Sequence, residues 1–230
     1  MTTSVAALMR VLQFGDSVLP IGSFAFSNGL ESAVQEGQVR DLRTLREFVS
    51  TACCRAASTD GIALLEAHRA ARDLDLDRLV RTDRALYSRK LNEETRTMSV
   101  RMGRKLVEIA DHVLDSPLVA TWLTKIRDQQ TPGCYPVALG LLFAVLGLSE
   151  RDAFAVHQYG VSMMMLSASL RLMRIRYADV QTILFDLNAE AEADYERYSG
   201  CTIDEMRAFA PAMDILAAGH AKAHVRLFMS

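Results

Sequence analysis

The sequence lacks the residue patterns of the common catalytic classes. Its 230 residues contain no G-x-x-x-x-G-K-[ST] phosphate loop, no G-x-G-x-x-G after a strand, no H-E-x-x-H and no G-x-S-x-G elbow. No Glu-x-x-His pair occurs, so the ligand spacing of a di-iron bundle is also absent. These absences argue against nucleotide hydrolases, dinucleotide-dependent enzymes, zinc proteases and serine hydrolases, and we predict that the chain is not an enzyme.

Charge of one sign, paired cysteines and long apolar runs are scarce as well. The formal net charge is -2, so nothing favours a nucleic-acid partner. The four cysteines have neither a zinc spacing nor a disulfide pattern, which favours reduced thiols in a cytoplasmic protein. A long uncharged stretch, residues 131–149, is broken by proline and glycine, whereas a membrane span needs about 20 apolar residues. We therefore predict a buried core helix there, no membrane segment and no signal peptide.

What the sequence does contain is helix-forming composition and helix-start signals. Alanine, leucine, methionine and arginine are abundant, and apolar residues recur at helical spacing. Asp41, Ser116 before Pro117, and Ser149 with Asp152 are typical N-terminal caps. We expect an all-α fold, a single domain over residues 1–230 built as a bundle of about nine or ten helices. The expected helices cover residues 3–14, 23–36, 41–72 with a break near Gly61, 75–89, 93–114, 117–128, 135–147, 150–173, 177–198 and 204–226.

Two side-chain pairs leave alternative functions open. His220 and His224 lie four residues apart on an expected helix, so both imidazoles could bind one nickel, zinc or copper ion. Two ligands alone make an incomplete metal site, but they support the alternative of a helical protein that itself carries nickel. Glu190 and Asp194 share a helix face, and paired carboxylates can perform acid–base chemistry. An enzyme that uses these two acids would need a deep pocket in which their pKa values are raised.

The most unusual segment is the chain between residues 12 and 31. A helix is expected to end there, and Leu-Pro-x-Gly is expected to turn the chain, because proline fixes one backbone angle and glycine permits angles that other residues resist. A second helix is expected to begin near Ser23 and to carry Glu31 in its first turns, where the helix dipole favours an acid.

This segment resembles the signature of the urease accessory protein F family (UreF), Leu-Pro-x-Gly-x-Phe-Ser-x-Ser-x-Gly-Leu-Glu. The matching residues are Leu19, Pro20, Gly22, Phe24, Ser27, Gly29, Leu30 and Glu31. Further elements follow in the family's order: Met102-Gly103-Arg104, Pro136 with Gly140, Arg171-Leu172, Asp179 with Gln181, Asp214-Ile215, His220, and the closing Arg226-Leu227-Phe228-x-Ser230.

The resemblance implies a function in the assembly of the nickel centre of urease. Members of the family are all-α scaffolds that dimerise, bind a second accessory protein (UreD, also called UreH), and recruit the nickel-carrying GTPase UreG to the urease apoprotein. Nickel and GTP would then be handled by the partner proteins, and this chain would bind no cofactor stably.

The resemblance also implies which residues meet these partners. They are Pro20, Gly22, Phe24, Ser27, Gly29, Glu31, Arg171, Asp179, Gln181, His220, Arg226, Leu227 and Phe228. Glu31 and Arg171 are the candidates for modulating GTP hydrolysis by the partner, with Asp179 and Gln181 behind them. Leu227 and Phe228 would anchor a docking tail, in which Arg226 pairs with a carboxylate.

Two parts of the chain depart from the family pattern. The family commonly has Arg-Leu-x-Pro-Leu-Gly-Gln, whereas this chain continues after Leu172 with Met173, Arg174, Ile175, Arg176 and Tyr177. Two added cations change the electric field around this loop, which predicts an altered partner contact. Phe26 stands where a tyrosine is common, so one hydroxyl group is lost.

Overall fold

The computed structural model describes residues 4–207, 216 and 227–228 of the chain. Every regular element in this part is helical and no strand occurs in it, so the all-α prediction is confirmed. The α-helices are α1 (Val5–Gly15), α2 (Leu30–Gln35), α3 (Leu42–Ala56), α4 (Ile62–Arg72), α5 (Leu76–Arg89), α6 (Glu93–Val113), α7 (Pro117–Arg127), α8 (Tyr135–Val145), α9 (Glu150–Leu172) and α10 (Tyr177–Tyr198). Short 3-10 turns are η1 (Ser23–Ala25) and η3 (Ile203–Glu205), and η2 (Ala57–Gly61) is a π-helical turn.

The predicted helix starts agree with the caps that the structure contains. The Asp41 side chain accepts a hydrogen bond from the Thr44 backbone N–H at the start of α3. Ser116 caps α7 with Pro117 as the first helical residue, and Ser149 and Asp152 form a reciprocal capping box at the start of α9. These helices begin where the sequence predicted because a cap is a local interaction that a few neighbouring residues determine.

Two expected helices differ from the structure. The expected helix 23–36 is instead the 3-10 turn η1 followed by α2, which begins only at Leu30. Asn28 and Gly29 separate them with φ angles of 53° and 82°, which a right-handed helix does not allow. For the expected helix 204–226, the described part shows η3, a non-helical chain at residues 206–207 and a helical conformation at Leu216. The break expected near Gly61 is the π-helical turn η2, which joins α3 to α4 without interrupting the rod.

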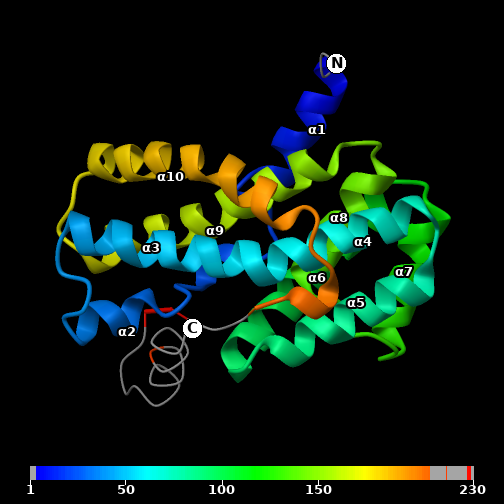
Figure 1. The fold of residues 1–230 in the computed structure, drawn as a ribbon, viewed down its shortest axis with the longest axis horizontal. Helices are drawn as coiled ribbons and strands as arrows, with labels where there is room; N and C mark the ends of the chain where they lie inside the picture. The colour runs from blue at the N-terminus through cyan, green and yellow to red at the C-terminus, as the bar shows by residue number, and fades with distance from the viewer. Residues whose placement is uncertain (1–3, 208–215, 217–226, 229–230) are drawn as a thin grey trace.

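The larger hydrophobic core lies where α4, α5, α6, α7 and α8 meet the first turns of α9 (Figure 1). Helix α8 is buried at its centre, as predicted for the uncharged stretch 131–149. Gly140 lets α8 approach α4 closely: a Cβ atom added there would lie 2.3 Å from the Leu64 carbonyl oxygen. Gly103 of α6 is equally constrained, since its Cβ would lie 2.1 Å from the Gly133 carbonyl oxygen.

The smaller core lies at the other end of the bundle, between α2, α3, α10 and the last turns of α9. It includes Leu30, Leu45, Leu166 and Leu184, and the C-terminal Phe228 belongs to it. Helix α9 contributes side chains to both cores, which makes the bundle one all-α domain. Within the described residues, no helix is long and apolar enough to cross a membrane.

Candidate partner-binding site

The loop between α1 and α2 has a shape that its own sequence dictates. The Asp16 carboxylate accepts a hydrogen bond from the Val18 N–H at 2.9 Å, and Pro20 then turns the exposed chain toward Gly22. Gly22 and Gly29 have φ angles of 89° and 82°, in the region that favours glycine. The matched proline and glycines of the motif therefore set the path of the chain between the two helices.

Glu31 is the acid that this path delivers to the first turn of α2. Its side chain is buried, with the residue only 1% exposed. Its Oε1 accepts a hydrogen bond from the Leu227 N–H at 2.9 Å, and its Oε2 accepts one from the Phe228 N–H at 3.2 Å. One carboxylate thus holds two successive backbone amides of a segment almost two hundred residues away in sequence. Hydrogen bonds to an ionised acceptor are stronger than neutral ones, so this is a firm attachment point.

Arg171 lies beside this attachment, at the end of α9. Its guanidinium carbon is 4.3 Å from the centre of the Phe24 ring and 4.0 Å from the centre of the Phe228 ring. One of its N–H groups also donates to the Phe24 carbonyl oxygen at 3.2 Å. Because aromatic faces attract a guanidinium, Arg171 links the loop before α2 to the C-terminal residues.

The five clustered residues differ in what they offer to solvent. Glu31 and Phe228 are buried, the latter at 5% exposed. Phe24 and Leu227 are 65% and 67% exposed, and Arg171 is exposed beside them. We call the exposed trio Phe24, Arg171 and Leu227 the tail surface. Exposed aromatic, aliphatic and arginine side chains held on a rigid base are typical of protein-binding sites.

Other residues of the motif have structural positions. Ser27 is fully buried, and Phe26 is buried in the larger core. At Phe26 the aromatic ring therefore fills apolar space, which explains why a residue without the hydroxyl group is accommodated there.

Asp179 and Gln181 lie at the start of α10, and both are partly buried. The carboxylate of Asp179 accepts two hydrogen bonds from Arg176, at 2.7 and 2.9 Å. This pairing lowers the pKa of Asp179 from its usual value. Arg176, one of the two added cations, is the N-cap residue of α10, so it engages an acid on its own helix rather than the tail surface.

The proposed histidine pair and part of the tail lie outside the described residues. These are His220, His224 and Arg226. Among the residues that are described, no group of three or more His, Cys, Asp and Glu could hold a metal ion. All four cysteines, which are described, are free thiols.

The acids Glu190 and Asp194 lie on the side of α10 that faces α3. Glu190 is exposed and forms an ion pair with Arg46 at 2.8 Å, and it also accepts a hydrogen bond from Ser50. Burial raises the pKa of Asp194, and the neighbouring Glu190 contributes to the rise. The pair has one of the two properties expected of catalytic acids, but Glu190 is an exposed ion-paired residue, not the wall of a pocket.

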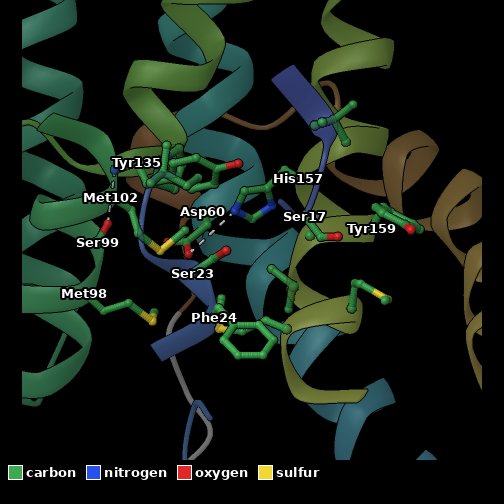
Figure 2. Close-up of a pocket in the computed structure, with 18 of the residues that line it drawn as sticks. Ser17, Ser23, Phe24, Asp60, Met98, Ser99, Met102, Tyr135, His157 and Tyr159 are labelled. Atoms are coloured by element: carbon green, nitrogen blue, oxygen red, sulfur yellow. Dashed lines mark hydrogen bonds and ion pairs between the residues drawn. The ribbon is translucent and has the colours of Figure 1, made fainter. Parts of the chain in front are cut away.

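A pocket that sequence analysis did not predict lies beside the tail surface. Figure 2 shows its walls, which come from the loop after α1, from α6, from the start of α8 and from α9. The empty volume of the pocket, with the open solvent at its mouth included, is about 850 Å³. Phe24 lines this pocket while also stacking on Arg171, so the pocket and the tail surface share a wall.

A buried polar cluster forms one side of the pocket. Asp60, on the π-helical turn η2, pairs with the Lys90 ammonium at 2.8 and 3.1 Å. His157 Nε2 is 3.9 Å from the Asp60 carboxylate, and its ring stacks on Tyr135 with the ring centres 6.2 Å apart (Figure 2). Burial lowers the pKa of His157 to about 4, against the opposing charge of Asp60. Burial also raises the pKa of Tyr135 to about 12, so both rings are neutral near pH 7.

No short-range pattern could have revealed this cluster. Its members come from η2, the end of α5, α8 and α9, and only tertiary packing brings them together. The π-helical turn itself is the only local signal, since such turns are frequent at functional sites. The glycine near which the break in the rod was expected, Gly61, is the last residue of that turn.

Comparison with known proteins shows which family of sequences this chain resembles. The sequence model of the family UreF matches residues 39–188. "Urease accessory protein UreF 2" of Brucella canis is 53% identical over 227 residues, which cover 99% of this chain and 93% of that protein. "Urease accessory protein UreF" of Yersinia enterocolitica is 50% identical over 221 residues, covering 96% of this chain and 97% of that protein. Both similarities extend beyond the stretch matched by the family model.

Proposed function

Because this chain belongs to the UreF family of urease accessory proteins, we propose that it acts in the maturation of urease as a helical scaffold. Membership in an accessory family makes it a helper protein and not a catalytic enzyme. Its work would be to bring partner proteins together while the nickel centre of urease is assembled. It would act in the cytoplasm and bind no nucleic acid.

We propose that the partners are those implied by the sequence motif. They are the second accessory protein UreD (UreH), the GTPase UreG and the urease apoprotein. GTP and nickel would be bound by these partners, and this chain would hold neither stably. Nickel carriage by His220 and His224 remains the alternative. Titration of the isolated protein with Ni²⁺ would separate the two, because a pure scaffold should bind nickel only weakly.

The observation that carries the proposal is the attachment of the C-terminal residues to the motif. Glu31 fixes the backbone of Leu227 and Phe228, and Arg171 lies between two aromatic rings. The most characteristic motif residues therefore build one continuous surface instead of separate features. This surface forms only when the segments near both ends of the chain are folded together. Such a surface suits a scaffold that binds its partner only in the folded state.

We propose a division of roles within this cluster. Glu31 and Phe228 are buried, so they position the tail and do not themselves reach a partner. Phe24, Arg171 and Leu227 are the exposed groups that would contact it. Arg171 is the candidate for influencing hydrolysis of GTP, since a positioned cation stabilises charge that develops on transferred phosphate.

We propose dimerisation as well, with α1 as its surface. Helix α1 projects from the bundle (Figure 1), and it exposes four apolar side chains at helical spacing, Val5, Leu8, Met9 and Leu12. An apolar stripe of this kind is unusual on a surface that faces only water. Its burial against the same stripe of a second copy would be a self-complementary contact.

In the decisive experiment, the gene is deleted in its host, and the intact gene or a variant is then put back. Urease activity and nickel content per urease protein are measured in each strain. Deletion should leave urease present but inactive and poor in nickel, and the intact gene should restore both. Phe24→Ala and Arg171→Ala should each reduce activation about tenfold or more, as expected for central interface residues. Arg127→Ala is the matched control, because it removes the same charge from an exposed arginine at the end of α7.

Three outcomes would each contradict a part of the proposal. Fully active, nickel-loaded urease in the deletion strain would exclude a function in maturation. Unchanged activation by both the Phe24 and the Arg171 variants would leave the function but remove the tail surface from it. Deletion of residues 226–230 should in addition weaken binding to the second accessory protein, and unchanged affinity would exclude a docking tail.

A further inference from the structure

The pocket beside the tail surface contains a buried polar atom with nothing to bind. His157 is 2% exposed, and its Nδ1 makes no hydrogen bond with any of the described residues. A buried polar atom without a partner is costly, and native proteins rarely leave one without a reason. Because His157 lines the pocket, a group that enters the pocket could supply the missing hydrogen bond.

The surroundings of His157 determine which kind of group this is. The ring is neutral near pH 7, so only one of its nitrogens carries a proton. The Asp60 carboxylate lies 3.9 Å from Nε2, and its negative charge favours the proton on that side. Nδ1 is then left with a lone pair and accepts. The entering group must therefore donate a hydrogen bond.

The rest of the pocket is suited to an aromatic ring. Its walls include the thioethers of Met98, Met102 and Met164 and the rings of Phe24 and Tyr135. Methionine sulfur makes favourable contacts with aromatic edges, and flexible methionines are common in surfaces that receive side chains of other proteins. Aromatic rings also pair favourably with one another.

Gly160 gives an independent indication that the pocket receives a group from another molecule. It lies in the interior of α9, where glycine destabilises a helix by about 1 kcal/mol relative to alanine. An added Cβ there would have no described atom within 4 Å, so no packing among the described residues requires glycine. Gly160 lines the pocket, and a side chain at this position would reduce the space.

We infer that this pocket receives an aromatic side chain that ends in a hydrogen-bond donor, a tyrosine or tryptophan of the partner protein that binds the tail surface. The inference rests on the proposed function for the identity of the partner. Continuity supports a partner's side chain as the occupant, because Phe24 is both a wall of the pocket and a member of the tail surface. His157 Nδ1 accepts the hydrogen bond, and the absence of a side chain at Gly160 leaves space in the pocket wall.

The first test uses p-cresol, the side-chain analogue of tyrosine, with the full-length protein. Methyl-labelled methionine provides NMR signals for Met98, Met102 and Met164 in the pocket walls. We expect p-cresol to shift these signals in a saturable way. Toluene, which lacks the hydroxyl group, should bind about fivefold more weakly, as expected for one buried hydrogen bond. Unchanged methionine signals, or equal binding of both compounds, would contradict the inference.

Two variants separate the two parts of the site. Gly160→Leu fills the pocket and should weaken p-cresol binding at least tenfold, an effect of steric exclusion. Ala189→Leu, on the exposed side of α10, is the matched control and should leave binding unchanged. His157→Phe keeps an aromatic ring but removes the acceptor, so it should abolish the preference for p-cresol over toluene. A Gly160→Leu protein that still binds p-cresol normally would exclude this pocket as the site.

The second test asks whether the occupant belongs to the partner. In the host strain, Gly160→Leu should reduce co-purification of the accessory partners and activation of urease, while Ala189→Leu should not. If Phe24→Ala abolishes activation but Gly160→Leu does not, the proposed function stands and the inferred side-chain docking is wrong. If p-cresol binds only after dilution to a monomer, a second copy of the chain covers the pocket, which also contradicts a partner's side chain as occupant.

Discussion

Glycines have opposite roles in the two halves of this molecule. In the larger core, Gly103 and Gly140 stand where an added Cβ would lie 2.1 and 2.3 Å from a backbone carbonyl oxygen. In the pocket wall, Gly160 would place a Cβ where no described atom lies within 4 Å. Gly103 and Gly140 allow helices to touch, whereas Gly160 leaves space in the pocket wall unfilled. In the core, glycine therefore allows close contact between helices. In the pocket wall, glycine leaves space that a side chain of a partner could fill.

The largest expected effect tests the packed half. Gly140→Ala forces a methyl group against the Leu64 carbonyl, so α8 must move away from α4. We expect the free energy of unfolding to fall by about 4 kcal/mol, at the upper end for a single overpacked position. Urea denaturation followed by circular dichroism measures this. A loss below about 1 kcal/mol would mean that the two helices separate easily, which would remove the contrast between the halves.

The second largest effect is a loss of stability at low pH, and it is expected to differ between the two buried histidines. His68, in the larger core, has its Nε2 2.9 Å from the Leu148 carbonyl oxygen, whereas His157 faces the pocket. Burial lowers the pKa of both, and that of His157 to about 4 from 6.5. The unfolded chain therefore binds more protons than the folded one between these values. The stability associated with His157 is complete above pH 6.5 and is lost as the pH falls toward 4, by about 3 kcal/mol.

Measuring unfolding free energy between pH 7 and pH 4 checks this prediction. His157→Phe should flatten the curve markedly, and a corresponding change at His68 should flatten it less. His112→Gln is the control, since His112 is exposed. An unchanged slope in His157→Phe would show that the pocket is accessible enough to water for the histidine to titrate normally.

The third effect concerns the attachment of the tail. Glu31→Gln replaces a charged acceptor of two hydrogen bonds by an amide with a single acceptor oxygen. We expect amide hydrogen exchange at Leu227 and Phe228 to accelerate about tenfold, corresponding to about 1.4 kcal/mol. Glu36→Gln, at the exposed end of α2, is the matched control. Equal exchange in both variants would show that other contacts hold the tail.

The smallest effect has the opposite sign. Gly160→Ala adds a methyl group to an open helical position, so it should stabilise the protein by about 0.5–1 kcal/mol. The same denaturation assay as for Gly140→Ala measures it. A destabilised Gly160→Ala protein would reveal a close contact at this position and would contradict the description of the pocket wall as unfilled.

Much of the fold was predictable because helix ends depend on near neighbours. Asp41, Ser116 and Ser149 each bind a backbone N–H three residues ahead, so their function as caps is written in a short stretch of sequence. The start of α2 was missed for the opposite reason. The motif looked helical by composition, but the conformation of Asn28 and Gly29 with positive φ depends on how the loop packs.

The sequence predicted residues of the site only where they belong to the family motif. Phe24, Glu31 and Arg171 were expected to be functional from the resemblance, but their mutual contacts were not. Glu31 reaches Leu227 across 196 positions, and no periodicity reports a contact of that range. Asp60 and His157 carry no sequence signature at all, because burial and packing alone give them an unusual environment.

The π-helical turn η2 has a consequence for how this sequence tolerates length changes. A π-helical turn accommodates one residue more than the α-helical ladder, and each residue rotates a helix by about 100°. The extra residue lets α3 face the smaller core while α4 faces the larger one. Deleting a single codon between Ala57 and Gly61 would restore a regular helix and yet turn α4 away from α8. At this point the number of codons in the gene fixes the rotational phase of α4 in the bundle.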